Sequence, residues 1–461
     1  MAKAAQGRAD VLLTEYSMAH LAAAAALTKA GRRVVVLSGE SVSEAPDGVL
    51  PPLGLLPPGG PGTLLERLLD AGEIAPRVRT AFRTPPILFQ VIWPGFRVDV
   101  CSNPQDYRRA LNREFGPEQA ERITRFEQAL EADALSLRRA VLGWNPFPPA
   151  GFFARFRRKS GPPHLSGSAK RNLHKGLGEA LGAAGLGEDA QRFIKFYLSA
   201  MGVFGNESAP FAPASLWLAD SEREHALLPP EDVADVRELI QRALHKRGAQ
   251  LLNTSLQEVS KGPEGLWRVR TADGREVLAR YVIEGERALQ QNLARQGGVL
   301  LRTRTLRAVI EPTAIPPGMC PRGVIVSDPA GSLTGENLIA YLIERPGEDE
   351  KQAKLYATVF SPEDGSDNGP SREAVMGRLE TVLPYVQDFC ARSAWLPAQA
   401  EARFPAGPRG LRNLGLVGAP HGLKGKRHLA LGRSNAPLLG VWGELKSAFS
   451  LADRILEKLT D

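Results

Sequence analysis

The chain has 461 residues, a formal net charge of +7 and 43% hydrophobic residues. This length and hydrophobic content exclude a disordered chain and favour two domains over a single core. The three cysteines, Cys101, Cys320 and Cys390, are too few and too far apart for a disulfide framework or a metal cluster. The N-terminal residues lack the apolar core of a signal peptide, so we expect a soluble cytoplasmic protein.

The first forty residues have the pattern of a β-α-β unit. Residues 11–13 and 33–37 are short apolar stretches that predict buried parallel strands. Between them, residues 18–29 form an alanine-rich segment that predicts a helix ended by Gly31. A right-handed crossover of this size is typical of the start of a dinucleotide-binding sheet.

The middle of the chain predicts a mixed α and β region. A Pro94-Gly95 turn between two apolar stretches indicates a hairpin, and helical spacing of apolar residues follows it. The expected strands are 87–93, 96–100, 251–259, 266–271, 276–283, 304–310, 323–326, 354–360 and 427–431. The expected helices are 63–71, 107–139, several within 172–203, 233–247, 372–393 and 445–459. Sequence alone therefore gives an α/β fold with an α+β insertion.

The interval between Asp133 and Glu179 contains no acidic residue and carries the excess positive charge. Three phenylalanines and four cations alternate within it: Phe152, Phe153, Arg155, Phe156, Arg157, Arg158 and Lys159. This composition is typical of an anchor in the membrane interface, and it also fits a solvated basic loop. Nucleic acid is a less favoured partner, because no recognition motif accompanies the patch.

Four stretches, at residues 10–37, 89–131, 233–283 and 428–455, together resemble FAD-dependent oxidoreductases of the phytoene-desaturase, protoporphyrinogen-oxidase and amine-oxidase type. The resemblance covers nearly the whole chain. It implies an FAD/NAD(P)-binding Rossmann-like domain with an inserted α+β substrate-type domain. The implied FAD-like parts are 1–80, 226–290 and 416–461, and the implied substrate-type parts are 81–225 and 291–415.

The glycine-rich turn of that family has lost its glycines in this chain. The positions of G-x-G-x-x-G hold Glu15, Ser17 and His20, although glycine is needed there for close approach of the backbone to a pyrophosphate. Two like charges about 4 Å apart repel by roughly 4 kcal/mol at an effective dielectric near 20, so the Glu15 carboxylate would oppose a phosphate. As a helix N-terminal acid, Glu15 would instead satisfy the helix dipole.

The other flavin contacts of the family are also altered. Ser38 stands where the second strand ends in an acid that binds ribose, and Glu284 and Glu286 stand near the adenine position. The C-terminal flavin segment keeps three glycines but has an arginine in place of its aspartate; these positions are Gly432, Arg433, Gly440 and Gly443. Arg433 either forms a salt bridge with Glu15 in place of the phosphate or binds a phosphate directly.

Six further histidines have no spacing of metal ligands or of a catalytic group, and we expect them at the surface or at helix ends: His164, His174, His225, His245, His421 and His428. We therefore predict no catalytic residue and no metal site. The sequence favours a flavin-free binding, regulatory or scaffold protein for a lipophilic ligand or a partner protein. The Rab GDP-dissociation inhibitors, which share the fold, lack flavin and handle prenylated proteins, are an analogy.

Two other functions stay open from the sequence. One is an FAD-dependent oxidoreductase or desaturase that acts on a lipophilic, isoprenoid-like substrate, with FAD as its cofactor. The other is an inactive subunit that pairs with an active paralogue. Attachment to the membrane periphery through the phenylalanine and arginine segment is compatible with each of them.

Overall fold

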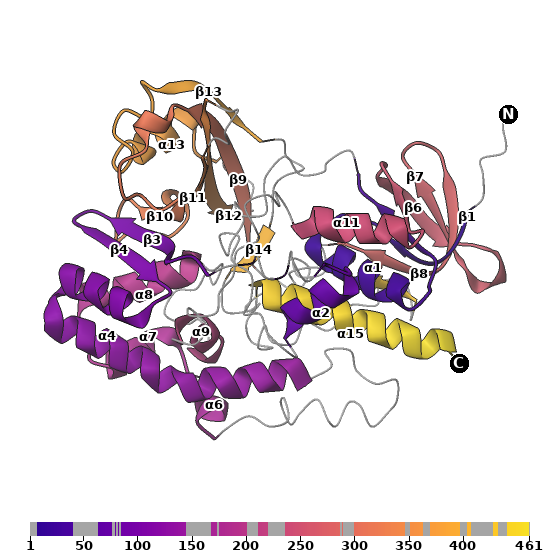
Figure 1. The fold of residues 1–461 in the computed structure, drawn as a ribbon, viewed down its shortest axis with the longest axis horizontal. Coiled ribbons are helices and arrows are strands. Elements are labelled where there is room, and N and C mark those ends of the chain that lie inside the picture. Colours follow the sequence, from indigo (N-terminus) through magenta and orange to yellow (C-terminus); the bar gives the residue numbers. More distant parts are fainter. Residues whose placement is uncertain are drawn as a thin grey trace.

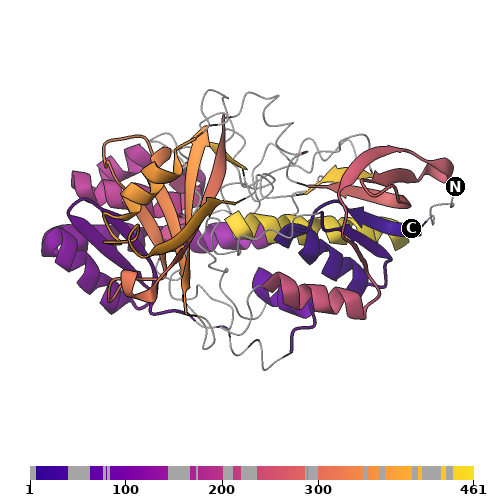
Figure 2. The same cartoon turned by 90° about the horizontal axis from the view of Figure 1, so that it is seen from above.

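A computed structural model gives the fold, which consists of two lobes that are each built on one β-sheet (Figures 1 and 2). The structure describes residues 7–39, 63–75, 79, 82, 84–143, 167–172, 175–200, 211–219, 236–285, 288, 299–345, 351–362, 369–396, 403–406, 427–431 and 440–460. The first described strand begins and the last described helix ends on the outer side of the first lobe, away from the second lobe (Figures 1 and 2).

The first sheet combines a parallel half with an antiparallel half. Its strand order is β5-β2-β1-β8-β7-β6, and β15 pairs with the second half of β8. The parallel strands are β5 (Gln250–Leu252), β2 (Val34–Leu37), β1 (Gly7–Leu13), β8 (Glu276–Glu284) and β15 (His428–Ala430). The antiparallel strands β6 (Leu256–Lys261) and β7 (Trp267–Thr271) extend from the first half of β8.

In the described part of the chain, four helices belong to the first lobe: α1 (Met18–Lys29), α2 (Leu64–Ala71), α11 (Val236–Lys246) and α15 (Gly440–Thr460). Ala19 and the four alanines at 22–25 in α1 are fully buried, and their small side chains allow α11, α15 and α2 to pack against this helix. The Ser17 side chain caps the N-terminus of α1, and Gly31, at φ 74°, ends it in the left-handed conformation that glycine adopts at low cost.

The second sheet has the order β13-β9-β12-β11-β10-β3-β4, and β14 also pairs with β9. All of these pairs are antiparallel except β3 with β10. The strands are β3 (Ile87–Trp93), β4 (Phe96–Cys101), β9 (Val299–Ile310), β10 (Arg322–Val326), β11 (Gly335–Glu344), β12 (Ala353–Pro362), β13 (Cys390–Trp395) and β14 (Arg403–Ala406).

Helices cover both faces of the second sheet. One face packs against α4 (Pro104–Gly143), α7 (Leu177–Ala183), α8 (Glu188–Ala200) and α9 (Phe211–Leu218), and the short α6 (Gly167–Asn172) lies beside α4. The other face packs against α13 (Arg372–Leu379). Successive side chains of a strand point to opposite faces of the sheet, which explains the two cores. Trp93 lies in the core on the side of α4, and Ile92 lies in the core on the side of α13.

The structure confirms the predicted fold class and corrects two of the predicted elements. The predicted strand at 251–259 is two strands, because the chain turns after Leu252 and β6 leaves for the antiparallel half of the sheet. The predicted helix at 372–393 ends at Leu379, since Pro384 cannot continue a helix, and residues 390–395 form β13. Strand β11 had not been predicted.

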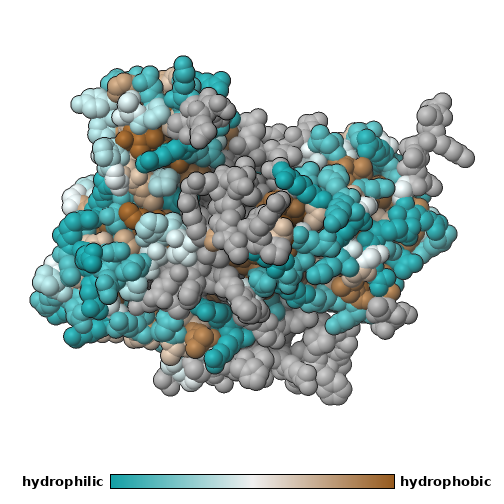
Figure 3. All heavy atoms as spheres, in the orientation of Figure 1, coloured by the Kyte–Doolittle hydropathy of each residue, from teal (hydrophilic) through white to brown (hydrophobic). Residues whose placement is uncertain are grey.

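On the face shown in Figure 3, hydrophilic residues cover most of the described surface of both lobes. Within the described residues, no helix combines the length and the apolar character needed to cross a bilayer. The segment with Phe152, Phe153 and Phe156, the neighbouring Arg155, Arg157 and Arg158, and Lys159 lies outside the described residues, so its role as an anchor stays a prediction.

Candidate functional site

The parallel strands of the first sheet all end along the edge that faces the second lobe (Figures 1 and 2). We call this the carboxyl edge; in sequence it follows Leu13, Leu37, Glu284 and Ala430. Open α/β sheets bind their ligands outside the carboxyl ends of their strands. The carboxyl edge is therefore the position to search for a cofactor or ligand site.

The turn after β1 is held in place by contacts to its neighbours. The Thr14 amide donates to the Ile283 carbonyl over 3.0 Å, which extends the pairing of β1 with β8. The Tyr16 hydroxyl donates to Gln241 Oε1 on α11 over 2.5 Å. Ser17 then begins α1, with its hydroxyl accepting from the His20 amide. The side chains of Tyr16 and Ser17 thus hold this turn in place.

The Glu15 carboxylate lies against the backbone of Gly285, directly after β8. A Cβ atom added to Gly285 would lie 1.7 Å from Glu15 Cδ and 2.0 Å from each carboxylate oxygen. Such contacts are impossible, so only glycine leaves room for the carboxylate as it stands. Glu15 therefore fills the space between the carboxyl ends of β1 and β8.

His20 is buried under the same turn. Its side chain has no exposed surface, and its Nδ1 lies 2.7 Å from Ser17 Oγ. Burial lowers the pKa of His20 to about 4, and the nearby main-chain carbonyl of Glu284 opposes this shift only in part. Its Nε2 has no hydrogen bond of normal geometry in the described part of the chain. The imidazole is therefore neutral at pH 7, and its Nδ1 shares a hydrogen bond with the Ser17 hydroxyl.

A second buried histidine lies on the last strand of the sheet. His428 has no exposed surface, its Nε2 lies 2.5 Å from Glu284 Oε1, and its ring centroid lies 4.9 Å from that of Trp267. Its Nδ1 has no partner among the described residues. The prediction that His428 lies at the surface or at a helix end is wrong, because β15 pairs with β8 and buries it. His245 is exposed, in line with its prediction, and the other four lie outside the described residues.

The remaining predicted cofactor positions are Ser38, Gly432, Arg433, Gly440 and Gly443, of which three lie within the described residues. Ser38 lies at the end of β2, with its hydroxyl 3.2 Å from the Leu252 carbonyl of the neighbouring strand. Gly440 and Gly443 lie in the first turn of α15. Gly432 and Arg433 lie outside the described residues, so the contact between Glu15 and Arg433 stays a hypothesis.

These side chains do not fit the diphosphate of a dinucleotide in its usual place. Glu15 puts a carboxylate at the turn after β1, where the family resemblance places the phosphates, and a carboxylate repels a phosphate. The Ser17 hydroxyl uses one of the free amides at the start of α1, which would otherwise bind an anion. The neutral His20 offers no positive charge in compensation.

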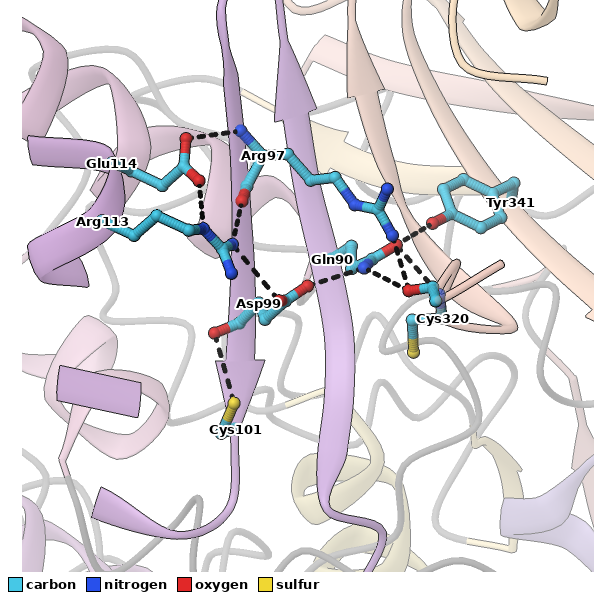
Figure 4. A network of polar contacts seen from close by, with 9 residues as sticks. Gln90, Arg97, Asp99, Cys101, Arg113, Glu114, Cys320 and Tyr341 are labelled. Atoms are coloured by element: carbon cyan, nitrogen blue, oxygen red, sulfur yellow. Dashed lines mark hydrogen bonds and ion pairs between the residues drawn. The ribbon is translucent and has the colours of Figure 1, made fainter. Parts of the chain in front are cut away.

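A second polar cluster lies in the second sheet, around Gln90 on β3 (Figure 4). Its amide donates to Asp99 Oδ1 over 2.6 Å and to the Gly318 carbonyl over 3.3 Å, and accepts from the Cys320 amide over 2.9 Å and from the Tyr341 hydroxyl over 3.3 Å. These contacts use the full hydrogen-bonding capacity of the amide. The cluster therefore joins β3, β4, β11 and the loop before β10.

The cysteines of this cluster are not nucleophiles. Burial raises the pKa of the Cys101 thiol to about 11, and burial also raises the pKa of Cys320. Both thiols are thus protonated at neutral pH, and a protonated thiol is a poor nucleophile. Over the described ranges, moreover, no three histidine, cysteine, aspartate or glutamate side chains form a group that could hold a metal ion.

Comparisons of the chain with known proteins identify its fold. A putrescine oxidase bound to putrescine is similar over 98% of this chain and 100% of that chain, with a TM-score of 0.60 and 16% identity. A Rab GDI from Plasmodium falciparum is similar over 99% of this chain and 98% of that chain, with a TM-score of 0.54 and 10% identity. No family model and no curated protein matches the sequence. The chain therefore has the two-domain fold of FAD-binding amine oxidases and Rab GDI, and these identities show the fold alone.

Proposed function

We propose that this chain is a flavin-free protein of the amine-oxidase and Rab GDI fold, and that it acts by binding a lipophilic ligand or a partner protein in a regulatory or scaffolding role. The observation that carries the proposal is the Glu15 carboxylate seated on Gly285 at the carboxyl edge. An acid in this position would repel a diphosphate, and the buried neutral His20 beside it would not attract one.

The two solved structures support different parts of the proposal. Rab GDI, by its name, acts on another protein, and its likeness to the whole chain supports a binding role on this fold. The phenylalanine and arginine segment around Phe153 supports a lipophilic surface as the second binding element. Peripheral attachment to a membrane would follow from such a segment.

A flavin-dependent oxidoreductase is the second candidate function. The likeness to putrescine oxidase over the whole length favours it, since that protein is an oxidase by name. In that case FAD would have to bind with its phosphates displaced from the turn after β1. A third possibility, an inactive subunit beside an active paralogue, would appear as a flavoprotein that copurifies in fixed ratio.

Absorbance of the purified protein and of its heat supernatant tests the absence of flavin. We expect no flavin band, and no saturable binding of FAD up to about 1 mM. The variants Glu15→Gln and, as a matched control on the exposed surface of α4, Glu118→Gln are titrated in parallel. If charge repulsion excludes the diphosphate, only Glu15→Gln gains measurable affinity.

Stoichiometric flavin in the native protein would overturn the proposal in favour of the oxidoreductase. The binding role is tested on the same preparation by flotation with anionic liposomes. We expect the native chain to float and a variant with Phe152, Phe153 and Phe156 replaced by serine to remain in the soluble fraction. Equal behaviour of the two proteins would remove the lipophilic segment from the proposal.

A further inference from the structure

A pocket of about 410 Å³ lies at the opposite edge of the first sheet, where the parallel strands begin. We call this the amino edge. Arg8 and Arg280 lie on β1 and β8, and Arg33 and Arg427 immediately precede β2 and β15. Parallel strands begin on the same side of a sheet, so the four arginines converge there. Lys458, from the last turn of α15, completes the basic lining.

Carboxylates only partly balance these five cations. Glu264 pairs with Arg8 over 3.2 Å, and Asp10 lies 3.8 Å from Arg33 and 3.9 Å from Arg280. Within the described residues, Arg427 and Lys458 form no salt bridge. Among the residues that the structure describes, five positive charges against two negative charges leave an excess of three around one small pocket. Such crowding of like charge is unfavourable, and a bound anion would relieve it.

The walls of the pocket also include apolar and aromatic side chains. Ala9, Leu266 and Leu459 contribute apolar surface, and the Arg427 guanidinium lies 5.9 Å from the centroid of the Tyr281 ring. The volume falls within the range of about 300 to 1,000 Å³ that is typical of small-molecule pockets. Arginine binds phosphate oxygens in pairs, which lysine does not.

We propose that this pocket binds a small polyvalent phosphate, either free or carried by an organic group. The binding site is distinct from the carboxyl edge, where ligands of this fold class are expected. It does not depend on the proposed absence of flavin, because the two edges lie at opposite ends of the strands. The chain would thus carry an anion site on the outer end of its first lobe.

Isothermal titration of the full chain with inorganic tripolyphosphate tests the proposal, with sulfate at equal ionic strength as the reference anion. We expect saturable binding of tripolyphosphate that Arg427→Glu weakens at least about tenfold, the loss expected for a charged hydrogen bond. Lys458→Glu, on the exposed end of a helix, provides a second variant whose folding is at little risk. Arg108→Glu, at an exposed position on α4 in the other lobe, makes the same change in net charge and serves as the control.

We expect the control to change the affinity by less than about twofold, as surface charges far from a site do in moderate salt. Circular dichroism and the melting temperature confirm that each variant is folded. Absence of saturable binding to the native chain would overturn the proposal. Equal weakening by Arg108→Glu and Arg427→Glu would also overturn it, because attraction to the overall positive charge would then explain the binding.

Discussion

Gln90 in the second sheet and His20 in the first sheet are both fully buried polar side chains, but their surroundings differ. Each donor and acceptor of the Gln90 amide has a partner, and these partners come from three other segments (Figure 4). His20 has one polar contact of normal geometry from its ring, to Ser17, and its second ring nitrogen has none in the described part of the chain.

The difference separates a polar cluster whose central amide is fully hydrogen-bonded from a site whose histidines are only partly hydrogen-bonded within the described residues. Buried polar groups in native proteins are almost always hydrogen-bonded, so a fully satisfied network such as that of Gln90 needs no ligand. His20 and His428 each keep one ring nitrogen without a hydrogen bond of normal geometry among the described residues, and both lie next to Glu284 at the carboxyl edge. These two histidines therefore lie where open α/β sheets bind their ligands.

The largest loss of stability is expected when the hydrogen-bonded cluster around Gln90 is broken. Gln90→Leu keeps the size of the side chain but leaves the Cys320 amide and the Tyr341 hydroxyl without their buried partner, whereas Asp99 keeps Arg113 and the Gly318 carbonyl keeps Arg97. Each buried group left unsatisfied costs about 1–3 kcal/mol, so we expect the free energy of unfolding to fall by about 2–6 kcal/mol. Urea denaturation measures this change.

Gln105→Leu is the matched control, because Gln105 is exposed at the start of α4. Its effect should stay within about 0.5 kcal/mol, as for most surface substitutions. A loss of less than about 1 kcal/mol for Gln90→Leu would mean that the cluster is not structural, and the contrast with His20 would disappear.

The sequence predicts the strand that carries Gln90 and the helix that carries His20. The sequence predicts a helix at residues 18–29 with the bounds that it has, because local signals define it: alanines throughout and Gly31 at its end. The order of strand, turn and helix also placed Glu15, Ser17 and His20 at the positions of the glycine-rich turn. Both results depend on residues that are close in sequence.

The contacts that give these regions their chemistry depend on distant residues. Gln90 is separated by 228 residues from Gly318 and by 251 from Tyr341, and in sequence it only interrupts an apolar strand. His428 is 144 residues from Glu284, and its burial follows from the pairing of β15 with β8. The apolar residues after His428 were the available sequence signal for its burial, because a buried strand can begin with a histidine.

A fall in pH should lower the free energy of unfolding by a similar amount, because His20 is buried at the carboxyl edge. The pKa of His20 is about 4 in the folded chain and 6.5 in the reference state, so the unfolded chain binds more protons between these values. Stability is therefore lost as the pH falls through this window, and the loss approaches about 3 kcal/mol near pH 4. Unfolding free energies of the native chain and of His20→Gln, measured from pH 7 to pH 4, test this.

We expect the native chain to lose about 3 kcal/mol more than His20→Gln over that range, whatever their difference at pH 7. His245→Gln, at an exposed position on α11, should keep the pH profile of the native chain. Parallel profiles for the native chain and His20→Gln would show that His20 titrates normally, and the neutral imidazole would no longer distinguish the carboxyl edge.

The smallest effect, and the one that bears most directly on the filled carboxyl edge, concerns Gly285. Its added Cβ would meet the far end of the Glu15 side chain, which can rotate away, so Gly285→Ala should cost only about 1 kcal/mol. Glu15→Ala removes the obstacle, and in that background Gly285→Ala should cost almost nothing. The coupling energy of this double-mutant cycle is thus expected to be about 1 kcal/mol.

Gly7→Ala on β1 is the control for this cycle, because an added Cβ there meets no atom within 4 Å. Its effect should be the same with and without Glu15. If the coupling between Gly285 and Glu15 were zero, the carboxylate would not occupy the gap between β1 and β8. The carboxyl edge would then be open to a diphosphate, whereas a measured coupling would place the acid where the phosphates of a bound dinucleotide would have to lie.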